Sequence, residues 1–268
     1  MMMQLSLYAM FTMKSFQQHF VYRANTLILM LGSFLKLFVL ISVWRGLFHG
    51  REEIGGVTYD HMILFVLINL LVGTLTHSRI GDTIGEKVIS GNISTDLLRP
   101  ISFKTYIIAD QWGENLFRFL FSAIPACVIY FVFMSIPTVP SEPSRIILFL
   151  ISVTSGIIII YHIHYLLGLT SFWTGNSYYV DWFMRAFFEL FAGTFVPLWF
   201  YPQFLLQIGT FLPFRLVTFE PIAILVGKTS ISGAIGIIAL QWGWIVALVL
   251  LEKWVWQRAQ NKVFIQGG

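Results

Sequence analysis

The sequence predicts an all-α polytopic membrane protein with six transmembrane helices, an N-terminal interfacial helix and an outer re-entrant helical hairpin between helices 5 and 6. Of its 268 residues, 57% are hydrophobic and 11% are charged, against about 45–50% and 25% in soluble domains. The mean hydropathy is +0.76, and a soluble surface needs more charge than this. These values exclude a soluble enzyme and a disordered tail, and the single cysteine, Cys127, excludes a disulfide scaffold.

Six apolar segments have roughly the 20 residues that a helix needs to cross about 30 Å of hydrocarbon. They cover residues 26–44, 60–77, 112–136, 145–173, 182–200 and 230–251. Tryptophan favours the membrane–water interface, and seven of the nine tryptophans fall at the ends of these segments. We therefore expect residues 1–268 to form one transmembrane domain. Its first span is expected to be an anchor, because it lacks the cleavage pattern of a signal peptide.

The placement of lysine and arginine predicts the orientation of the spans, since these residues concentrate in cytoplasmic loops. With six spans, the side that holds both termini carries ten of the 17 basic residues. The opposite side carries five, and two lie within spans. Both termini are therefore expected in the cytoplasm. This bias also accounts for the net charge of +4, so we expect no nucleic-acid partner.

Three segments outside the spans have distinct compositions. Residues 1–25 mix apolar and polar side chains, which is typical of a helix on the cytoplasmic leaflet; a frayed tail is the alternative. Residues 77–111 are nearly neutral and rich in glycine, which favours short helices that form a docking surface for another protein. Residues 197–228 hold four of the nine prolines yet stay apolar. They predict a helical hairpin that dips into the outer leaflet or packs against its twin.

No pattern in the sequence predicts catalysis, a bound cofactor or a metal ion. Residues 227–229 (GKT) resemble the end of a phosphate-binding loop, but Ile222 replaces the required glycine. His162 and His164 lie two residues apart on an expected helix, about 200° around its axis, so they cannot bind one metal ion together. We expect them to be packing residues, and we expect the chain not to be an enzyme.

Ionisable residues inside the spans are the strongest candidates for functional sites, because each is costly in lipid. Lys36 lies near the middle of the first span. Glu114 with Arg118, and Arg185 with Glu189, are spaced i, i+4 and can pair along one helix face. The first interpretation is buried ion pairs that hold helices together. A polar translocation path and end residues that extend toward water are the alternatives.

Three stretches resemble the permease subunits of small bacterial ABC exporters, in the order found in that family. Residues 89–100 (ISGNISTDLLRP) are similar to a G-x-(x)-D-x-L-L-x-P element between spans two and three. Residues 189–202 are similar to span five as it enters the outer segment, and residues 212–221 to the rest of that segment. The resemblance extends over nearly the whole chain in span number, orientation and loop placement. It indicates a poorly characterised subfamily that often has two permeases.

The resemblance implies a six-helix permease that exports an amphipathic or hydrophobic substrate through the bacterial plasma membrane. ATP and Mg²⁺ would bind to a separate cytoplasmic ABC ATPase, and a second permease copy or a sister permease would complete the transporter. Residues 1–25 would form an interfacial elbow, and residues 77–111 a coupling region. The residues expected to contact the ATPase are Glu86, Lys87, Asp96, Leu97, Leu98 and Arg99. In the alternative interpretation these side chains belong to a water-exposed loop and contact no partner.

An ion- or proton-coupled secondary carrier is the alternative function. Such carriers show internal repeats or paired broken helices near mid-membrane. The first three and the last three spans differ here in loop length and proline position, which disfavours that alternative. An integral-membrane enzyme would need a nucleophile or a metal cluster at one interface, and the sequence shows neither.

Overall fold

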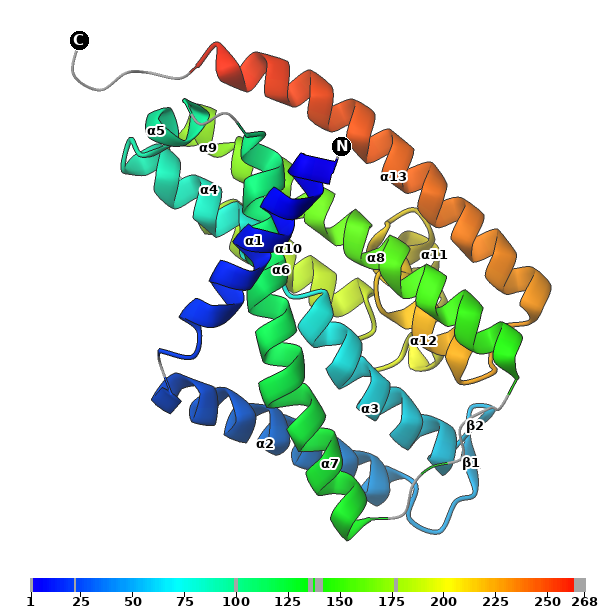
Figure 1. Cartoon of the computed structure of the whole chain (residues 1–268). Helices are drawn as coiled ribbons and strands as arrows, with labels where there is room; N and C mark the ends of the chain where they lie inside the picture. The colour runs from blue at the N-terminus through cyan, green and yellow to red at the C-terminus, as the bar shows by residue number, and fades with distance from the viewer. Residues whose placement is uncertain are drawn as a thin grey trace.

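The computed structural model describes residues 2–21, 23–98, 101–134, 137, 142–175 and 178–262, and these are mostly helical. The elements in chain order are α1 (Met2–Gln18), α2 (Arg23–Leu47), β1 (Glu53–Ile54), β2 (Val57–Thr58), α3 (Tyr59–Leu75), α4 (Ile80–Ile89), α5 (Ile93–Leu97), α6 (Phe103–Arg118), η1 (Phe119–Ala123), α7 (Ile124–Phe133), α8 (Pro143–Leu169), α9 (Ser171–Thr174), α10 (Tyr178–Phe191), η2 (Leu198–Phe200), α11 (Gln203–Thr210), η3 (Phe214–Leu216), α12 (Phe219–Leu225) and α13 (Ile231–Gln260). In Figure 1 the short antiparallel β1–β2 pair lies at one end of the molecule, and α4, α5 and α9 lie at the other.

Five helical segments are long and apolar enough to cross a membrane. They are Ala24–Leu47, Tyr59–Ile89, Phe103–Phe133, Pro143–Thr174 and Ile231–Gln260. Each overlaps one of the spans predicted from the sequence, namely the first, second, third, fourth and sixth. The structure therefore confirms a mostly helical chain with five candidate membrane-spanning helices.

The predicted fifth span, residues 182–200, is not one continuous helix. α10 has 14 residues and ends at Phe191, which gives a length of about 21 Å against the roughly 30 Å of a bilayer core. Gly193 then adopts a left-handed conformation with φ of +68°, a common way to end a helix. The prediction of a helix over 182–200 is therefore wrong, and six spans are not confirmed within the described residues.

The third span begins earlier than the sequence predicts. α6 starts at Phe103 rather than near Trp112, so the predicted cytoplasmic segment 77–111 includes the first turns of this helix. The helix widens into the π-helical turn η1 directly before Pro125. Proline lacks an N–H and clashes with the carbonyl four residues before it, and a π turn accommodates that missing bond.

The helix predicted within residues 1–25 is present as α1, which packs against α6 (Figure 1). The two backbones touch, because a Cβ atom on Gly113 would lie 2.4 Å from the carbonyl oxygen of Thr12. The hydroxyl of Ser15 donates to the carbonyl oxygen of Asp110 at 2.7 Å. α1 is therefore fixed to the third span, while its position at the membrane surface is not confirmed.

The central helix is α8, which packs against α13, α4 and α12. Two of its glycines permit close approach of other segments. A Cβ on Gly156 would lie 2.7 Å from the carbonyl oxygen of Val217, and a Cβ on Gly168 would lie 2.7 Å from Cδ1 of Ile84. α8 therefore connects the outer segment to α4, from one end of the molecule to the other.

The outer segment 197–228 contains two short α-helices, α11 and α12, which differ in their surroundings, and the predicted re-entrant hairpin is not confirmed. α12 is buried at every residue and packs on α8 and α3, whereas α11 exposes Phe204 and Ile208. Gln241 of α13 donates to the carbonyl oxygen of Leu216 at 2.7 Å, so irregular backbone is satisfied by the chain itself. A position inside the outer leaflet is not confirmed.

Candidate functional site

Between α3 and α6 the chain forms a helical hairpin of α4 and α5, residues 80–98. Gly91 turns the chain between the two helices with φ of +73°, a region that favours glycine. Lys87 on α4 forms an ion pair with Asp96 on α5. Asp96 is only 4% exposed, so its carboxylate joins the two helices and is not presented to a partner.

The outer surface of the α4–α5 hairpin carries one acidic and two apolar side chains. Glu86 is exposed, Ile89 is 54% exposed and Leu98 is 86% exposed. Leu97 is half-buried against the core, and Arg99 lies outside the described residues. Two residues predicted to contact a partner therefore point outward, and Ile89 joins them although sequence analysis did not single it out.

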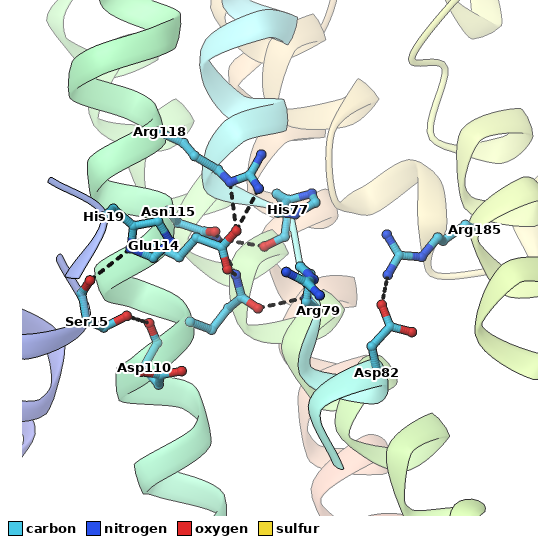
Figure 2. Close-up of polar contacts among 11 residues, drawn as sticks. Ser15, His19, His77, Arg79, Asp82, Asp110, Glu114, Asn115, Arg118 and Arg185 are labelled. Atoms are coloured by element: carbon cyan, nitrogen blue, oxygen red, sulfur yellow. Dashed lines mark hydrogen bonds and ion pairs between the residues drawn. The ribbon is translucent and has the colours of Figure 1, made fainter. Parts of the chain in front are cut away.

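α4 is held from two sides. Ile84 is fully buried and packs against Gly168 of α8. Asp82 accepts a hydrogen bond of 2.7 Å from Arg185 of α10 (Figure 2). The sequence predicted that Arg185 would pair with Glu189 on its own helix. The ion pair instead joins α10 to the hairpin, because α10 packs against α4 and brings Arg185 to Asp82.

The chain between α3 and α4 is fixed by side chains of α6 (Figure 2). Asn115 is fully buried and donates to the carbonyl oxygens of Leu75 at 2.9 Å and His77 at 2.7 Å. Gln111 accepts a 2.7 Å hydrogen bond from the backbone N–H of Arg79. Buried polar groups need such partners, and here they determine where the hairpin leaves the second span.

Glu114 and Arg118 form the ion pair that their i, i+4 spacing predicts, with an N–O distance of 2.7 Å. The side chains are 13% and 23% exposed, so the pair is partly buried. A buried charge without a partner is costly, and Glu114 compensates Arg118 here.

A polar cavity of about 260 Å³ lies among α2, α3, α6, α8 and α10. Four of the five intramembrane charges predicted from the sequence line it: Lys36, Arg118, Arg185 and Glu189. The fifth, Glu114, lies behind Arg118 and holds it. Other polar residues in the wall are Asn69, His77, His164, Thr194 and Thr218. The structure therefore brings together charges from three helices, α2, α6 and α10, that are far apart in the sequence.

The two histidines of α8 have different surroundings. His164 lines the cavity, whereas His162 bonds to the carboxylate of Glu252 on α13. The other oxygen of that carboxylate lies 2.6 Å from Nζ of Lys104. This cluster joins α6, α8 and α13, and sequence analysis missed it because its members lie 58 and 90 positions apart.

One comparison with known proteins gives a match. A family model described as "ABC-2 family transporter protein" matches residues 27–267. No curated protein and no solved structure matches the chain. The matched range includes the α4–α5 hairpin and all residues that line the cavity.

Proposed function

The chain belongs to the ABC-2 family of transporter proteins, and from this premise we propose that it is the permease of an exporter driven by a separate ABC ATPase. The family supports a membrane permease that partners with ABC ATPase subunits and is not itself catalytic. In this proposal ATP and Mg²⁺ bind to the ATPase. The substrate is amphipathic or hydrophobic, because the spans surround one polar cavity with mostly apolar surface.

The α4–α5 hairpin is the observation that carries this proposal. It is braced internally by the Lys87–Asp96 pair, yet it exposes Ile89 and Leu98. Exposed apolar side chains beside a charged one are typical of a protein docking surface. Because Asp82 ties the same hairpin to α10, a force applied there by an ATPase would reach the cavity wall.

The proposed orientation places the hairpin and both termini in the cytoplasm of a bacterial cell. The C-terminal end of α13 and the α4–α5 hairpin lie at the same end of the molecule in Figure 1, which agrees with the distribution of basic residues. α10 and the outer segment together would supply the sixth crossing, since α10 alone is too short. A second copy or a sister permease would complete the pathway.

The test is to isolate the tagged chain from its native membrane in a mild detergent and to measure ATP hydrolysis by the complex. We expect a co-purifying subunit whose sequence contains a nucleotide-binding cassette. The double variant Glu86→Lys/Leu98→Asp should lose that subunit, because it alters the docking surface while leaving the Lys87–Asp96 pair. Glu52→Lys, an exposed acid next to β1 at the opposite end, is the matched control.

Two results would contradict the proposal. One is retention of the ATPase by the hairpin variant at the level of the control. The other is transport by the chain reconstituted alone, without ATP, which would favour the ion- or proton-coupled carrier.

A further inference from the structure

The polar cavity is lined by more positive than negative side chains. Lys36, Arg118 and Arg185 face a single carboxylate, Glu189, among the described residues of its wall. The carboxylates that pair with the two arginines lie behind them and do not line the cavity. Because those carboxylates compensate Arg118 and Arg185, the charge available to an anion that enters the cavity is mainly that of Lys36.

Lys36 is the cation in this wall with the least compensation. Within the described residues it forms no ion pair, and its ammonium lies 5.6 Å from the ring centroid of Phe195. The carboxylate of Glu189 attracts it only at longer range. A lysine near the middle of a span is costly and commonly marks a functional site, and this ammonium is placed to bind a further anion.

Four buried polar atoms of the same wall have no hydrogen-bond partner within the described structure. They are Oδ1 of Asn69, Nε2 of His77, Oγ1 of Thr194 and Oγ1 of Thr218. Asn69 is 5% exposed and Thr218 is 1% exposed. Buried polar atoms are nearly always satisfied in native proteins, and hydroxyl groups can donate to the oxygens of an anion. Among these atoms, the hydroxyls of Thr194 and Thr218 are the ones that can donate to an anionic ligand in the cavity.

We propose that this cavity binds the anionic head group, phosphate or carboxylate, of a substrate with an apolar tail. The inference rests on the proposed export function and adds the chemical class of the substrate. Lys36 supplies the main charge contact, and the hydroxyls of Thr194 and Thr218 donate hydrogen bonds. Leu35 and Val39, which are near Lys36 on α2, are exposed, so the tail can remain against apolar surface while the head group enters the cavity.

The experiment titrates the purified permease, in a neutral maltoside detergent and without ATPase, by native mass spectrometry. The probes are dilauroyl phosphatidic acid, dilauroyl glycerol with the same tails, and inorganic phosphate. The wild type should bind phosphatidic acid in preference to both. Lys36→Gln should weaken this binding by about 10- to 100-fold, as expected for a charge-assisted contact. Lys36→Arg should retain it.

Lys253→Gln, which removes an exposed lysine of α13 far from the cavity wall, is the matched control and should bind as the wild type does. Thr218→Val tests the hydrogen bond with the charge intact, and it should weaken binding severalfold. Equal binding of the phospholipid and the neutral glyceride, or unchanged binding by Lys36→Gln, would overturn the inference. Equally tight binding of inorganic phosphate would overturn the proposal that the substrate has an apolar tail.

The same measurements separate this inference from the export proposal. Loss of head-group selectivity in a chain that still assembles with its ATPase would overturn the head-group inference and leave the export proposal standing. Selective head-group binding by a chain that recruits no ATPase would overturn the proposed function alone.

Discussion

Asp82 on α4 and Arg185 on α10 are joined by an ion pair of 2.7 Å (Figure 2), which ties the α4–α5 hairpin to the wall of the polar cavity. The two side chains are 26% and 36% exposed. Ion pairs of this exposure contribute only about 0–1 kcal/mol to stability. The consequence of this contact is therefore expected in the transmission of movement rather than in folding.

Asp82→Asn should lower transport severalfold while expression and ATPase binding stay at the wild-type level. The charge attraction between α4 and α10 is lost, but the buried face of α4 on α8 is unchanged. The measurement is ATP-driven transport and ATP hydrolysis by the reconstituted complex. The charge swap Asp82→Arg/Arg185→Asp should recover part of the transport. Full transport by the single variant would show that this contact does not couple the two parts.

Lys87→Glu should loosen the α4–α5 hairpin. It would place a second negative charge beside Asp96, whose carboxylate is 4% exposed, and like charges close together in a buried site repel each other. Because Lys87 itself is 21% exposed, we expect a loss of about 1–3 kcal/mol. The measurement is hydrogen exchange of the amides of residues 80–98.

The swap Lys87→Asp/Asp96→Lys should restore slow exchange in the hairpin. Glu86→Lys, a charge reversal at the exposed neighbouring position, is the matched control and should leave exchange unchanged. Fast exchange in both the control and Lys87→Glu would mean that the hairpin responds to any change of charge rather than to loss of the ion pair.

Hydropathy alone predicts the helices that are apolar over a full bilayer thickness. It fails at residues 192–200, because this stretch remains apolar after α10 ends, and composition does not distinguish an apolar helix from apolar irregular backbone. The left-handed Gly193 marks the break, but a glycine in an apolar run is also common within membrane helices. The signal was present in the sequence and ambiguous there.

The sequence predicts the charged residues of the cavity wall and one of their pairings, Glu114–Arg118. The free-energy cost of a charged side chain in lipid singles out Lys36 and the other intramembrane charges from the sequence alone. Spacing along one helix predicts Glu114–Arg118 correctly. It fails for Arg185, whose partner lies 103 positions away in the sequence. Contacts of that kind depend on which helices pack together, and a single sequence carries no direct signal for helix packing.

Gly113→Ala should detach α1 from α6. The new Cβ atom would lie 2.4 Å from the backbone oxygen of Thr12, so the helix must shift, with an expected loss of about 1–3 kcal/mol. Gly236→Ala on α13 is the matched control, because nothing lies within 4 Å of its added Cβ. Proteolysis within α1 should become faster only in Gly113→Ala, and equal rates would show that α1 does not depend on this contact.

The proposed orientation predicts which positions an impermeant thiol reagent reaches in intact cells. Cys127 is buried and is replaced by serine in every variant. Single cysteines at Glu53 and Glu142 should be labelled from outside, and cysteines at Glu86 and Gln260 only after permeabilisation. All four positions are exposed in the structure, so a missing label reports the side of the membrane. Labelling at Glu86 from outside would contradict cytoplasmic docking.

Glu189→Gln should tighten the binding of an anionic head group, opposite to the effect of Lys36→Gln. Glu189 lines the cavity and attracts the ammonium of Lys36, so its carboxylate competes with an entering anion. At an effective dielectric constant of about 20, one unit charge about 12 Å away contributes about 1.4 kcal/mol, or roughly tenfold in affinity, and more at shorter range. Glu189 is exposed and forms no ion pair among the described residues, so folding should change little.

Glu189→Asp, which keeps the charge, is the matched control in the phosphatidic acid titration. Weaker binding by Glu189→Gln would mean that the carboxylate itself holds the substrate, and the cavity would then select a cationic group.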